Sequence, residues 1–141
     1  MSKLEDFERI GGRKSLIAIN KVFYDKVYQH SWLKHYFLAV PQQHIEDQQV
    51  DFMQKVLGGK NLYVGKSPPI AHKHMFIPDE LFDVRKKILI EAFNETKAHP
   101  ELVDKWLNLD ESFRRLLVKK SLSECVARYK SEGILNFNKP E

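Results

Sequence analysis

The sequence predicts an all-α protein with a single domain. Between its glycines and prolines, apolar residues recur at the spacing of helices. Strand signals are weak, because the chain has no alternating run of β-branched residues and no Asn-Gly or Asp-Gly turn. A chain of 141 residues is long enough for one core and too short for two. We therefore treat residues 1–141 as one domain, and we expect its tail, about 133–141, to be flexible and frayed.

Two helices are predicted in the first half of the chain. The first covers 14–29 and has Tyr24 beside an apolar stripe made of Leu16, Phe23 and Val27. The second covers 42–57 and has Gln49 inside a stripe made of Ile45, Phe52, Met53 and Val56. Both helices therefore carry one polar side chain at or within the face that should turn inward.

Two further helices are predicted in the second half. One begins at Pro78, because a proline followed by two acidic residues is a favourable first turn. Its inward face is made of Leu81, Phe82, Ile88, Leu89, Ala92 and Phe93. A last long helix is expected over about 109–131, where it would bury Phe113, Leu116, Leu117, Leu122, Cys125, Val126 and Tyr129.

The segment 58–78 does not fit a simple helical bundle. It contains glycine turns, a double proline and only one short possible helix, near 69–75. An irregular segment of this length inside a compact domain is usually functional. It contains two histidines, His72 and His74, as candidate site residues.

Three polar residues therefore stand out, namely Tyr24, Gln49 and His72. Burying such a group without a partner costs about 1–3 kcal/mol. Each one alone is explained by a bond to a backbone carbonyl or to water. Together they suggest polar groups aimed into an apolar pocket, which is what a cofactor or a small ligand needs.

Composition narrows the range of partners. The net charge is +4, but Lys and Arg are dispersed and no basic segment is interleaved with aromatic residues, so no nucleic-acid partner is expected. The longest apolar run covers only 36–40, far short of a membrane span, and the first residues contain no apolar signal segment. We expect a cytoplasmic protein with no membrane partner.

Several short motifs occur in the order and at the spacing of one protein family. They are Ile10-Gly11-Gly12, Phe23-Tyr24-Asp25-Lys26-Val27, Leu33 with Tyr36-Phe37, Gln49-Val50-Asp51-Phe52, Leu57-Gly58-Gly59, Tyr63-x-Gly65, and Ala71-His72 followed by Ile77 and Phe82. Together they resemble the truncated (2/2) haemoglobins, a bacterial-type globin family, and are nearest to the group I pattern. The resemblance implies a globin-like, two-over-two helical sandwich around haem b (iron protoporphyrin IX).

The resemblance implies that His72 is the proximal ligand of the haem iron. Neutral imidazole is the usual axial donor in globins, and its second ring nitrogen needs a carbonyl or carboxylate partner. A backbone carbonyl of the short helix is a candidate, although several remain open. His74 is the rival ligand, and the spacing to Ile77 and Phe82 favours His72. We expect His74 to be exposed or near the haem edge.

On the other side of the iron, the resemblance implies that Tyr24 and Gln49 stabilise the bound ligand by hydrogen bonds. Phe37 should pack on the porphyrin face. Ile45 takes the place where many globins have a gating histidine or glutamine. The remaining apolar lining is expected from Phe52, Met53, Leu57, Tyr63, Phe76, Ile77 and Phe82.

Two positions depart from the family pattern. Arg85 stands where the family usually has Val or Trp near the haem. Either Arg85 extends to solvent or to a haem propionate, or the register slips and Val84 faces inward; we favour the propionate or haem-edge role. His44 adjoins Ile45, and a shift of one residue would place an imidazole over the iron and give a six-coordinate haem.

The function implied is reversible binding of dioxygen, NO or CO. Enzymatic NO dioxygenation or peroxidase-like turnover would need an electron-donor reductase as partner. A gas or redox sensor, an electron-transfer protein and a haem-free helical interaction module are the alternatives. The oligomeric state is expected to be a monomer or a weak dimer.

Overall fold

The computed structural model describes residues 2–140 and confirms the all-α prediction. Its helices are α1 (Lys3–Arg9), α2 (Gly12–Val27), α3 (Gln42–Val56), α4 (Pro68–His72), α5 (Asp79–Glu95) and α6 (Pro100–Leu117), with the 3₁₀ turns η1 (Leu33–Phe37) and η2 (Leu122–Glu124). Within these residues, β structure is limited to one isolated bridge between Met75 and Leu135. No helix in this part of the chain has the length and apolarity needed to cross a membrane.

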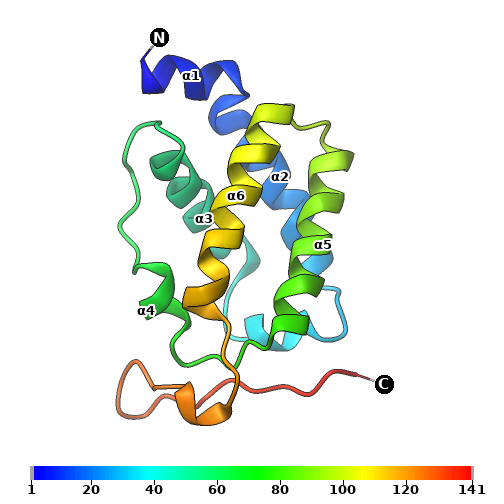
Figure 1. The fold of residues 1–141 in the computed structure, drawn as a ribbon, viewed down its shortest axis with the longest axis vertical. Helices are drawn as coiled ribbons and strands as arrows, with labels where there is room; N and C mark the ends of the chain where they lie inside the picture. Colours follow the sequence, from blue (N-terminus) through cyan, green and yellow to red (C-terminus); the bar gives the residue numbers. More distant parts are fainter. Residues whose placement is uncertain (1, 141) are drawn as a thin grey trace.

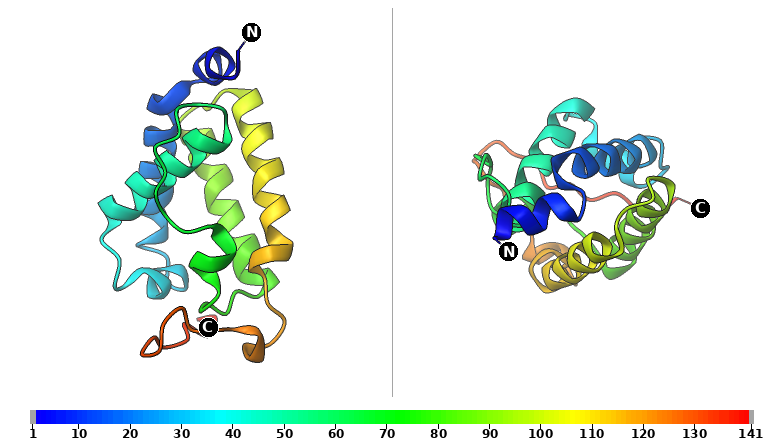
Figure 2. Two further views of the ribbon diagram at one scale, coloured as in Figure 1. Left: turned by 90° about the vertical axis from the view of Figure 1, so that its left-hand side faces the viewer. Right: turned by 90° about the horizontal axis from the view of Figure 1, so that it is seen from above.

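The four long helices form two layers. Helix α2 packs against both α3 and α5, while α5 and α6 lie side by side as an antiparallel pair (Figure 1). Seen from above, α2 and α3 form one layer and α5 and α6 the other (Figure 2). This is the two-over-two helical sandwich that the resemblance implies. The short α4 lies at the lower end of the long loop that follows α3 (Figure 1).

The predicted stripes on the first three long helices are largely confirmed. Leu16, Phe23 and Val27 are buried, as are all six residues assigned to the inward face of α5. On α3, Met53 is buried, whereas Val56 is 40% exposed and was wrongly placed in the stripe. The buried side of α3 is rotated instead towards Glu46, Val50 and Gln54.

The turn between α1 and α2 depends on glycine. Gly11 has φ +129°, a backbone conformation that residues with a side chain rarely adopt. A Cβ on Gly11 would lie 2.2 Å from Ser15 Oγ, which is closer than van der Waals contact allows. A residue with a side chain would therefore be strained at this position.

We expect Gly11→Ala to lower the free energy of unfolding by roughly 1–3 kcal/mol because of this strain. Urea denaturation followed by circular dichroism measures the loss. Gly133→Ala is the matched control, because a Cβ there meets no atom within 4 Å. An equal loss in the two variants would show that the φ of Gly11 is not the cause.

The last predicted helix is wrong at both ends. Helix α6 begins at Pro100, with the His99 side chain accepting a bond from Glu101 N, and it ends at Leu117 rather than near 131. After Leu117 the chain turns to α4 and the segment after it, where Lys119 N donates to Ile77 O at 2.9 Å. These long-range bonds replace those of a continuing helix. Four residues expected to be buried are about half exposed, namely Leu116, Leu122, Val126 and Tyr129.

The C-terminal segment crosses beneath the helical layers (Figures 1 and 2). Leu135 N donates to His74 O at 2.9 Å, and Leu135 O accepts from Phe76 N at 2.8 Å. Trp32 Nε1 donates to Phe137 O at 2.8 Å. The segment expected to fray thus makes specific contacts in the structure; its mobility stays a prediction.

Candidate functional site

A cavity of about 750 Å³ lies between the two layers, and residues of the C-terminal segment contribute to its lining. The sequence-predicted site residues that line it are Tyr24, Phe37, Ile45, Gln49, Phe52, Met53, Tyr63, His72, Ile77, Phe82 and Arg85. Leu57 and Phe76 do not line it. Leu57 packs on the core at the end of α3, and Phe76 contributes its backbone to bonds with Leu135 and Tyr36. The cavity therefore brings together most of the residues that the sequence selected from distant segments.

His72 supplies a nitrogen donor at the wall of this cavity. Its Nδ1 lies 2.7 Å from Pro68 O. Because a carbonyl only accepts, Nδ1 carries the proton and Nε2 keeps a lone pair. Removal of the ring from water lowers the pKa of His72 to about 4, so the imidazole is neutral at pH 7. A neutral, oriented imidazole is the form that ligates a metal.

Local sequence fixes the short helix that carries His72. Pro68 and Pro69 occupy the first turn of α4, where their missing N–H groups are not needed. Lys119 Nζ donates to Met75 O at 2.8 Å and to His72 O at 3.1 Å, which ties α4 and the residues after it to the end of α6.

The turn before α4 depends on Tyr63. Its hydroxyl donates to Lys66 O at 2.6 Å. A Cβ at Gly65 would lie 2.4 Å from the Tyr63 hydroxyl oxygen. Position 65 therefore needs glycine when Tyr63 takes this conformation, which explains why the two residues occur together.

His74 is buried, contrary to the expectation that it could be exposed. It is 3% exposed and lines the same cavity. Its Nε2 lies 3.8 Å from Glu132 Oε2, and Arg128 pairs with that carboxylate. Its Nδ1 has no hydrogen-bond partner among residues 2–140. His74 lies in the wall of the cavity, and its position relative to the haem edge stays a prediction.

Tyr24 and Gln49 bring hydrogen-bond donors from α2 and α3. The Tyr24 ring packs against Phe23 at 4.8 Å and Phe37 at 5.9 Å between centroids. Burial raises the pKa of the Tyr24 phenol, which therefore stays protonated at neutral pH. Neither side chain makes a hydrogen bond to another residue in the described part of the chain. Both therefore remain able to donate to a ligand.

The neighbours of Ile45 also reach the cavity. Ile45 is half-buried, whereas His44 is exposed although it contributes to the lining. Gln48, which the sequence did not single out, lines the cavity as well. The structure thus places Ile45 further inside than His44, and six-coordination through His44 stays an untested alternative.

Helix α6 contributes lining residues that sequence reasoning treated as packing or missed. They are Trp106, Leu109, Asp110, Phe113 and Leu117. The signal was present, because the apolar members recur at helical spacing along one face. It was lost when the helix was placed too late in the chain.

Arg85 does not extend freely into solvent, because its side chain is 29% exposed; its contact with a haem propionate stays a prediction. Its Nη2 donates to Asp110 Oδ1 on α6, and its guanidinium stacks on the Phe82 ring at 4.6 Å. Val84 does not line the cavity, so the structure has no slip of register at this point. A charged pair therefore stands in the wall of a mainly apolar cavity.

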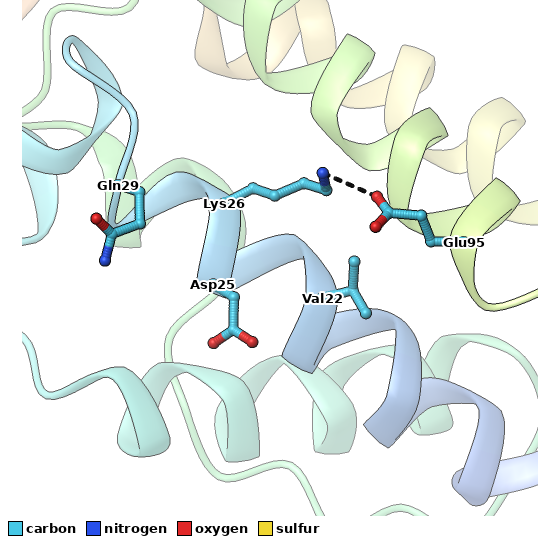
Figure 3. Close-up of a pocket in the computed structure, with 5 residues that line it drawn as sticks. All are labelled: Val22, Asp25, Lys26, Gln29 and Glu95. Carbon is cyan, nitrogen blue, oxygen red and sulfur yellow. Dashed lines mark ion pairs between the residues drawn. The ribbon is translucent and has the colours of Figure 1, made fainter.

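A second, smaller hollow of about 340 Å³ lies between α2 and α5 (Figure 3). Lys26 Nζ and Glu95 Oε2 form an ion pair across it at 2.8 Å. Asp25 and Gln29 point away from that pair (Figure 3). Because the Lys26 and Glu95 charges already satisfy each other, we place the functional site in the larger cavity.

Comparisons with known proteins agree with this geometry. Residues 5–118 match the family model described as bacterial-like globin. A group 1 truncated haemoglobin of Tetrahymena thermophila is 32% identical over 109 residues, which cover 77% of this chain and 90% of that protein.

Solved structures give the same result. The crystal structure of the truncated haemoglobin of Tetrahymena pyriformis in its Fe(III) form has a TM-score of 0.72 and 30% identity, covering 81% of this chain and 97% of that one. The group II truncated haemoglobin of Bacillus anthracis, at 21% identity and a TM-score of 0.73, shares the fold; it covers 84% of this chain and 92% of that one. The chain therefore belongs to the bacterial-like globin family and is a truncated haemoglobin of group I.

Proposed function

We propose that the cavity holds a b-type haem through His72 Nε2 and binds dioxygen, NO or CO reversibly beside Tyr24 and Gln49. The observation that carries the proposal is the His72–Pro68 bond of 2.7 Å, which leaves Nε2 unprotonated at the cavity wall. The Tyr24 phenol and the Gln49 amide line the same cavity and can donate hydrogen bonds to a bound gas ligand.

The residues present fit this cofactor. The volume of about 750 Å³ falls within the range of roughly 300–1,000 Å³ typical of ligand and cofactor sites. Phe37, Phe52, Met53 and Phe82 give it apolar and aromatic walls. An apolar cavity with an imidazole oriented by a backbone carbonyl suits a flat, mainly apolar metal complex that needs one axial ligand from the protein.

Different residues of the chain would bind the haem and the gas ligand. When bound, the haem iron supplies a coordination position for a diatomic gas. The Pro68 carbonyl holds the His72 ring and raises the basicity of Nε2. The Tyr24 phenol and the Gln49 amide donate hydrogen bonds to a ligand that carries partial negative charge, and the apolar walls exclude water. Oxidative turnover, such as NO dioxygenation, would require electrons from an external reductase.

Reversible binding is testable by absorption spectroscopy on the haem-loaded, reduced protein. We expect the spectrum to change when oxygen is admitted and to return when oxygen is removed under argon. Carbon monoxide should displace the oxygen and give its own stable spectrum. Immediate and complete oxidation of the iron on exposure to oxygen, in place of a reversible change, would contradict the proposal.

A further inference from the structure

A charged pair interrupts the mainly apolar wall of the cavity. Arg85 on α5 donates to Asp110 on α6, and both side chains line the cavity. Asp110 is 7% exposed. Its second oxygen, Oδ2, has no hydrogen-bond partner in residues 2–140, and the Lys86 ammonium lies 3.8 Å from it.

Stability alone does not account for this pair. Burying the Asp110 carboxylate is unfavourable, although the Arg85 side chain stays 29% exposed, and apolar residues of similar size are often equally or more stabilising than a buried pair. An apolar residue in place of Arg85 would fill the wall without a counter-ion. A charged pair whose burial is unfavourable for folding, and which faces a cavity, is a candidate for a role in ligand binding.

The Arg85 guanidinium is held in place, but most of its N–H donors make no hydrogen bond to the described residues. Stacking on Phe82 at 4.6 Å orients its plane. One bond, to Asp110, is its only hydrogen bond to the described residues, although a guanidinium has five N–H donors. The remaining N–H donors can therefore bind a ligand in the cavity.

We propose that Arg85 is a ligand-binding residue that makes this cavity prefer small anionic ligands, with Asp110 holding the guanidinium in place. Charge-assisted hydrogen bonds from a fixed guanidinium are stronger than those from neutral donors. Tyr24 and Gln49 are neutral donors, so Arg85 would add a preference for charge that they lack. The inference rests on the proposed haem site, because the anions concerned are ligands of ferric haem.

Fluoride and imidazole, as an anionic and a neutral ligand, provide the test. Both are titrated into the ferric, haem-loaded protein and followed by absorption. We expect Arg85→Met to weaken fluoride binding by at least about tenfold, the value of a lost charge-assisted bond. Imidazole affinity should change by less than about threefold. Arg85→Lys keeps the charge without the planar fork and should bind fluoride with intermediate affinity.

Arg114 offers a matched control. Its guanidinium stacks on the same Phe82 ring at 4.5 Å, but it pairs with Asp79, Asp83 and Glu111 and does not line the cavity. Arg114→Met should therefore leave fluoride affinity unchanged.

Three results would overturn the inference. One is equal weakening of fluoride and imidazole binding, and another is the same fluoride loss in Arg114→Met. The third is faster haem loss with unchanged fluoride affinity, which would assign Arg85 to a haem propionate instead. If Arg85→Met does not load haem, the test is made with Arg85→Lys alone. A fluoride affinity equal to that of the wild type in Arg85→Lys would then contradict the inference. Absence of a haem spectrum in the wild-type protein is a separate result, since it would contradict the proposed function itself.

Discussion

Replacing His72 with alanine is expected to abolish stable haem binding. The substitution removes the nitrogen donor that Pro68 orients. Loss of even an outer-shell partner of a metal ligand costs about 10–100-fold in affinity, so loss of the ligand itself should cost more. The rate of haem transfer to an excess of apomyoglobin measures the effect, and we expect it to rise by more than about a hundredfold.

His74→Ala is the control for this prediction. His74 is a buried histidine two residues away that lines the same cavity, but its Nε2 faces Glu132 rather than an open wall. We expect this variant to keep the axial ligand and the spectrum of the wild type. If His74→Ala loses haem while His72→Ala keeps it, the ligand has been assigned to the wrong histidine.

Replacing Tyr24 with phenylalanine is expected to speed the release of dioxygen by about tenfold or more. The ring should keep its packing against Phe23 and Phe37, so only the hydroxyl is lost. Because burial keeps that hydroxyl protonated, the wild-type phenol acts as a donor at neutral pH. Stopped-flow mixing of the oxygenated protein with dithionite and CO gives the dissociation rate.

Tyr28→Phe separates this effect from a general loosening of α2. The Tyr28 hydroxyl donates to Val40 O at 2.7 Å, and the residue does not line the cavity. Its dissociation rate should equal that of the wild type. An unchanged rate in Tyr24→Phe would remove Tyr24 from the ligand side of the site.

The parts of the fold that the sequence predicts well are those governed by local spacing. The stripes on α2 and α5 follow from helical periodicity, and they are buried as expected. His72 was singled out by its spacing to Ile77 and Phe82, and it lies on the cavity wall with them. The identity of its carbonyl partner, Pro68, required the structure because several carbonyls of α4 were equally plausible.

The parts that could not be predicted depend on contacts between distant residues. Apolar spacing continues beyond Leu117, but Lys119 bonds to Ile77, Met75 and His72 and ends α6. No local pattern encodes such bonds. The Arg85–Asp110 pair joins two helices across 25 positions of the chain, so the sequence showed an arginine on an inward face without showing its partner.

Titration of the purified, haem-free protein with ferric haem tests the central claim most directly. The account predicts a Soret band that grows until one haem is bound per chain and then stops. On reduction without oxygen, an iron–histidine stretching band should appear in the resonance Raman spectrum of the wild-type protein. A spectrum that remains that of free haem throughout the titration would contradict the account.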